Sequence, residues 1–72
     1  MKIHISRDYQ TPLTLDVDPT STLDDLRKIA ALEGIYLHRC LFEGKMLLDT
    51  RPLSDQGVKD GSIIHDVVPL RN

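Results

Sequence analysis

The segment from residue 22 to residue 35 has the apolar periodicity of one amphipathic helix. Thr22, with Asp25 three residues later, predicts a variant capping box at its start, and Gly34 followed by Ile35 is a typical helix ending. Between these ends the apolar residues recur at intervals of three or four, on one stripe of the helix. They are Leu23, Leu26, Ile29 and Ala30. A single helix of this kind must cover one face of a sheet, so the rest of the chain should supply strands.

Before this helix, apolar and polar side chains alternate, which predicts two half-buried strands. Ile3 and Ile5 lie in the first strand, and residues 13–17 form the second. The polar residues 7–12 between them predict a hairpin loop. Because Pro12 cannot donate a hydrogen bond to a neighbouring strand, we expect the second strand at an edge of the sheet.

After the helix, residues 39–58 predict two short strands and a single helical turn. Residues 40–42 and 45–47 flank Glu43 and Gly44, an arrangement typical of strands joined by a tight turn. Apolar residues at positions 53 and 58 enclose a polar turn, and a last strand begins at Ile63. The predicted order is strand, strand, helix, strand, strand, turn, strand. The fold class is therefore α+β, with no internal repeat or linker.

Composition and charge describe one ordinary globular domain and narrow its partners. A chain of 72 residues with 40% apolar and 28% charged residues fits a single compact domain. The net charge is −2 and no run of Lys or Arg tracks a phosphate backbone, so we expect no nucleic acid partner. No stretch approaches the roughly 20 apolar residues of a membrane span, or forms a signal peptide, which predicts a cytoplasmic or nuclear protein without membrane contact. The single cysteine, Cys40, agrees with a reducing compartment.

From Met1 to about Arg71 the sequence resembles ubiquitin and ubiquitin-like domains. The Gly44-Lys45 pair and the Leu53-Ser54-Asp55 turn are the most specific matches. Further matches are Ile3, Ile5, residues 14–19, Thr22, residues 33–35, Phe42, Leu47, Asp49, Arg51 and His65. The resemblance implies a β-grasp fold for residues 1–72 as one domain, in which a mixed sheet of four to five strands packs on the helix.

Two departures from ubiquitin bear on function. Ubiquitin and its conjugated relatives end in two glycines, which residues 67–72 of this sequence lack. Asp8 stands in the first hairpin loop, where ubiquitin has an exposed leucine that helps to grip partners. We therefore expect a non-conjugated interaction domain, the N-terminal module of a longer protein. The alternatives are a covalent modifier whose diglycine tail lies beyond Asn72 or was removed, and a structural or assembly module that reuses the fold.

A third departure is Asp66, which stands where the family normally has a buried leucine. A buried carboxylate without a partner is costly. We therefore expect the last strand to bulge near His65, so that Asp66 turns outward.

The resemblance also implies a partner-binding surface on the outward face of the central strands. Alternation places Leu41 on the opposite side from Cys40 and Phe42. An apolar patch rimmed with positive charge suits an amphipathic helix with acidic flanks. The expected patch residues are Leu41, His65 and Val67, and the expected rim residues are Arg39, Lys45 and Arg71. By resemblance the partners are ubiquitin-receptor helices, proteasome subunits or another domain of the same chain, and the domain itself should be a monomer.

No pattern in the sequence predicts an enzyme, a metal site or a cofactor. Cys40 lies in an apolar strand with no adjacent His or Lys, so we expect a small core hydrophobe rather than a nucleophile. The three histidines, His4, His38 and His65, lack the spacing of metal ligands.

Overall fold

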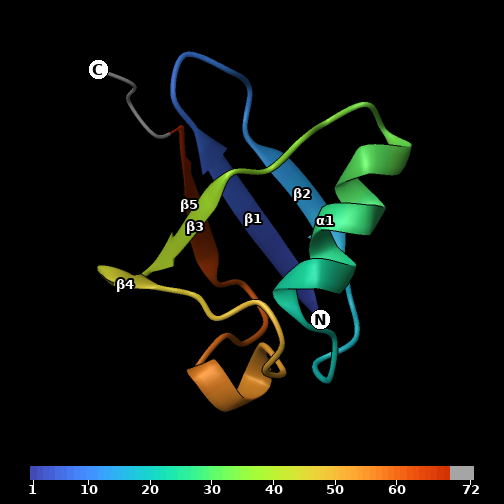
Figure 1. Cartoon of the computed structure of the whole chain (residues 1–72), viewed down its shortest axis with the longest axis vertical. Helices are drawn as coiled ribbons and strands as arrows, with labels where there is room; N and C mark the ends of the chain where they lie inside the picture. The colour runs from blue at the N-terminus through green and yellow to red at the C-terminus, as the bar shows by residue number, and fades with distance from the viewer. Residues whose placement is uncertain (69–72) are drawn as a thin grey trace.

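The computed structural model describes residues 1–68, which form a five-stranded mixed sheet with one helix across one face (Figure 1). The strand order is β2-β1-β5-β3-β4; β1 and β5 run parallel, and the other neighbours run antiparallel. The elements are β1 (Lys2–Arg7), β2 (Leu13–Asp16), α1 (Leu23–Leu32), β3 (Arg39–Phe42), β4 (Lys45–Met46), the 3-10 helix η1 (Ser54–Gln56) and β5 (Ile63–Val67). The α+β class and the order of elements are confirmed, and so is the edge position of β2.

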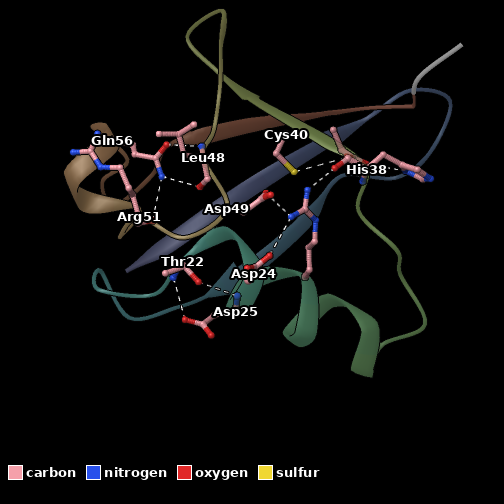
Figure 2. Close-up of polar contacts among 11 residues, drawn as sticks. Thr22, Asp24, Asp25, His38, Cys40, Leu48, Asp49, Arg51 and Gln56 are labelled. Atoms are coloured by element: carbon pink, nitrogen blue, oxygen red, sulfur yellow. Dashed lines mark hydrogen bonds and ion pairs between the residues drawn. The ribbon is translucent and has the colours of Figure 1, made fainter.

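Both predicted ends of α1 are confirmed. At its start the Asp25 backbone N–H donates to the Thr22 hydroxyl at 3.2 Å, and the Thr22 N–H donates back to the Asp25 carboxylate at 3.1 Å (Figure 2). The Thr22 N–H first, and then the Thr22 side chain, hydrogen-bond to the Asp25 carboxylate and hold its pKa below its ordinary value. At its end Gly34 adopts a φ of 76°, and the Ile35 N–H donates to the Ala30 carbonyl at 3.0 Å, as in a Schellman motif.

The core lies between α1 and the inner face of the sheet. The helix contributes its predicted stripe, and the inner strand positions face it in alternation. The buried apolar residues are Ile3, Ile5, Leu15, Val17, Leu23, Leu26, Ala30, Leu37, Cys40, Phe42, Leu47, Leu53, Val58 and Ile64. Cys40 is among them, which confirms its prediction as a core residue.

The predicted helical turn after β4 is η1, flanked in sequence by the buried residues Leu53 and Val58. The Gln56 side chain holds this turn against the loop that precedes it. Its amide oxygen accepts from the Leu48 N–H at 2.7 Å, and its amide nitrogen donates to the Leu48 and Arg51 carbonyls, both at 3.1 Å (Figure 2). The loop from β4 to η1 is therefore held by side-chain hydrogen bonds as well as by packing.

Glu43 and Gly44 form the predicted tight turn between β3 and β4, and both have positive φ, 51° and 79°. Such a pair is typical of a type I′ hairpin, which favours Asn-Gly, whereas glutamate is strained at positive φ. We expect Glu43→Asn to raise the free energy of unfolding by about 0.5–1 kcal/mol in urea denaturation. The matched control is Gly44→Ala. A Cβ at Gly44 meets no atom within 4 Å, so any loss in that variant reports backbone strain alone, and an unchanged Gly44→Ala would contradict the strain argument.

Candidate protein-interaction face

Strand register brings the predicted patch residues together on the outer face of the sheet, away from α1. Leu41 on β3 lies opposite His65 on β5, and Arg39 lies opposite Val67. Residues paired in this way share one face of a sheet. Leu41, His65 and Val67 are all half-buried and Arg39 is exposed, whereas their neighbours Cys40 and Phe42 are buried on the inner face.

Two exposed apolar residues that are not among the predicted patch residues extend this face. Ile63 precedes His65 by two positions on β5 and is 62% exposed. Met46 on β4 lies opposite Leu41 and is 56% exposed. The outward orientation of both residues follows from strand alternation and from the register of the tight turn, which can be recognised in the sequence. We call Leu41, Met46, Ile63, His65 and Val67 the outer strip.

Lys45, another predicted rim residue, lies elsewhere. Lys45 is exposed, but it pairs with Phe42, whose side chain faces the core. The register therefore puts Lys45 on the side of β4 opposite to Met46 and Leu41, at the edge of the sheet. Arg71 lies outside the described residues. Among the predicted rim residues that lie within residues 1–68, Arg39 is thus the one that strand pairing places beside the outer strip.

Asp8 lies beside the outer strip, on its β1 side. Its carboxylate is 3.5 Å from the Nε2 atom of His65, and both side chains are partly exposed to solvent. An exposed pair of this kind contributes roughly 0–1 kcal/mol to stability, so its main effect is on the local charge of the surface.

Asp66 corrects one expectation, because it points inward and the strand does not bulge. It is 5% exposed, and pairing on both sides of β5 continues through it, with Arg7 on β1 and Cys40 on β3. The carboxylate accepts the His38 backbone N–H at 2.7 Å and lies 3.4 Å from the His38 ring nitrogen Nδ1. The expected cost of burial is offset by these donors, so the outward turn is unnecessary.

The thiol of Cys40 lies 3.8 Å from the same Asp66 carboxylate (Figure 2). Burial first, and then the negative charge of Asp66, raise the pKa of Cys40 to about 12. A thiol with this pKa is almost entirely protonated at neutral pH and is a poor nucleophile. We therefore assign a structural role to the cluster that Cys40 forms with His38 and Asp66, near the C-terminal end of β5.

Residues 3–71 match the ubiquitin family of protein domains. The chain belongs to the ubiquitin family. It is also 32% identical over 62 residues to a protein of Dictyostelium discoideum named ubiquitin-like protein NEDD8, and the match covers 82% of this chain and 80% of that protein. The five-stranded mixed sheet with one helix is accordingly a β-grasp fold.

Membership of the ubiquitin family bears on the expected chemistry. The ubiquitin-like domain is a non-enzymatic fold, which confirms that this domain is not an enzyme. Within residues 1–68, no group of three or more His, Cys, Asp and Glu side chains could hold a metal ion. The same residues include no helix that is both long and apolar enough to cross a membrane. Ubiquitin-like domains bind proteins, and the outer strip is the candidate surface for such binding in this domain.

Proposed function

We propose that this ubiquitin-like domain is a non-covalent docking module that binds an amphipathic helix of a ubiquitin-receptor protein on its outer strip. The observation that carries the proposal is the unbroken register of β5, which keeps His65 and Val67 on one face with Leu41. Ile63 and Met46 add exposed apolar surface to that face. Contiguous exposed apolar groups on a small domain mark contact surfaces.

The charge of Arg39 supports an acidic residue on the partner. Arg39 is exposed beside Val67, at the β3 side of the outer strip. An acidic group on one edge of the bound helix would face its guanidinium, and such complementarity fixes orientation and speeds association. The bound helix therefore needs an apolar stripe for Leu41 and Val67 and an acidic edge for Arg39.

A helical peptide with an apolar stripe, Glu on one edge and Gln on the other tests the docking function. In NMR titrations we expect its addition to shift the signals of Leu41, His65 and Val67. Leu41→Ala should weaken binding by about tenfold or more, the loss typical of a central apolar contact. Leu32→Ala is the matched control, because Leu32 is 88% exposed but lies on α1, on the other side of the sheet. Shifts that avoid the outer strip, or equal binding by both variants, would refute the proposal.

Other occupants of the same face are distinguishable in the full-length protein. A proteasome subunit added in trans would compete with the peptide. Another domain of the same chain would make the outer-strip signals differ between the full-length protein and the isolated domain, without any added partner. Either result would retain docking and replace the ubiquitin receptor as the occupant.

Covalent modification is the rival function, and similarity across 80% of the Dictyostelium protein named NEDD8 favours it. The two proposals differ in the bond they require. Purification of the tagged full-length chain from its own cells under denaturing conditions separates them: a covalent adduct that survives denaturation supports a modifier, and its absence supports docking alone.

A further inference from the structure

Asp8 places a negative charge at the β1 side of the outer strip. In the β1–β5 pairing Ser6 lies opposite His65 and Arg7 lies opposite Asp66. Asp8 directly follows β1, at the start of the hairpin loop and two positions after Ser6. The 3.5 Å contact between the Asp8 carboxylate and His65 agrees with this placement.

Arg39 places a positive charge on the opposite side of β5. It lies across from Val67 on β3, so β5 has a carboxylate beside His65 on its β1 side and a guanidinium beside Val67 on its β3 side. Neighbouring strands are about 4.8 Å apart, so the two charges are separated by about two strand spacings, or 10 Å. Within residues 1–68 Arg39 forms no ion pair, so its charge is available to a partner. The outer strip is therefore electrically polarised across the strands.

We propose that Asp8 is a specificity determinant of the outer strip, selecting helices that carry a basic residue on one edge and an acidic residue on the other. This inference rests on the proposed docking function. A helix with acidic residues on both edges places one of them against Asp8 in either direction of binding, where like charges repel. A helix with one acidic and one basic edge satisfies Arg39 and Asp8 together.

Three helical peptides that differ at one edge test this selection. Each carries the same apolar stripe and the same Glu edge, and the second edge carries Lys, Gln or Glu. We expect the wild-type domain to bind the Lys peptide about fivefold more tightly than the Glu peptide, since exposed charge pairs contribute up to about 1 kcal/mol each. The ratio should decrease in high salt, because counterions screen exposed charges.

Two substitutions identify the residue responsible. Asp8→Asn removes the charge with little change in shape, and we expect it to reduce the ratio between the Lys and Glu peptides to less than twofold. Asp55→Asn is the matched control, because Asp55 is an exposed acidic residue of η1 outside the outer strip, and it should retain the wild-type ratio.

The outcomes separate this inference from the function on which it rests. Equal binding of all three peptides to the wild type, with shifts at the outer strip, would overturn the role of Asp8 and leave docking intact. An unchanged ratio in Asp8→Asn would do the same. A complete lack of shifts at Leu41, His65 and Val67 with every peptide would instead overturn docking itself, and the inference with it.

Discussion

Substitution of Asp66 by Ala is expected to lower the free energy of unfolding by about 2–3 kcal/mol, since it leaves a partly buried donor without an acceptor. The donor is the His38 backbone N–H, which lies 2.7 Å from the carboxylate. This bond joins the loop between α1 and β3 to the C-terminal part of β5, and the two residues are 28 positions apart in the sequence. Urea denaturation followed by circular dichroism measures the loss.

Two further variants at the same position separate the hydrogen bond from the charge and from packing. Asp66→Asn keeps an oxygen acceptor for the His38 N–H, so we expect it to cost less than half as much as Asp66→Ala. Asp66→Leu restores the apolar residue usual in the family and recovers buried surface, but it still leaves that N–H unpaired, so its stability should lie between the other two. A more stable Asp66→Ala protein would show that the hydrogen bond contributes nothing net.

The stability of the domain is expected to decrease above pH 9 because of Cys40. Its pKa is 9.0 when solvated and about 12 in the folded protein. Between these values the unfolded chain loses the thiol proton and the folded chain keeps it, so rising pH favours unfolding. From pH 8 to about pH 11 this thiol should remove on the order of 2–3 kcal/mol of stability.

Comparison with Cys40→Ala isolates this contribution. Tyr and Lys side chains also ionise in this range, so the quantity to measure is the difference between wild type and variant in the slope of unfolding free energy against pH. The variant has a small cavity and is less stable at pH 8, but its slope should be shallower. Parallel slopes would mean that the folded thiol ionises near its ordinary pKa. Alkylation by iodoacetamide gives an independent test, since native Cys40 should react far more slowly than the unfolded chain.

Local patterns predicted the elements of the fold well, because short-range chemistry determines them. The helix ends follow from the Thr22-Asp25 spacing and from Gly34, and the tight turn follows from Gly44. Alternation also predicted that Leu41 faces away from Cys40, and the burial of the two residues agrees. The parallel pairing of β1 with β5 brings together the two ends of the chain, and local patterns carry no such information.

The candidate site was less predictable, because its important contacts join distant residues. The inward position of Asp66 depends on the His38 backbone N–H as a hydrogen-bond donor, and no local pattern around β5 identifies that donor. The contact of Asp8 with His65 depends on the same long-range strand pairing. Met46 and Ile63, by contrast, follow from alternation and turn register, so a stricter use of the strand period would have found them.

The central position of β5 in the sheet determines when the sheet can form during synthesis on the ribosome. β5 pairs with β1 on one side and with β3 on the other, so without it the sheet consists of two separate hairpins. An isolated two-stranded hairpin is marginal in water. The domain therefore completes its sheet only after residue 67 has emerged from the exit tunnel, and the preceding residues stay accessible to chaperones and proteases until that moment.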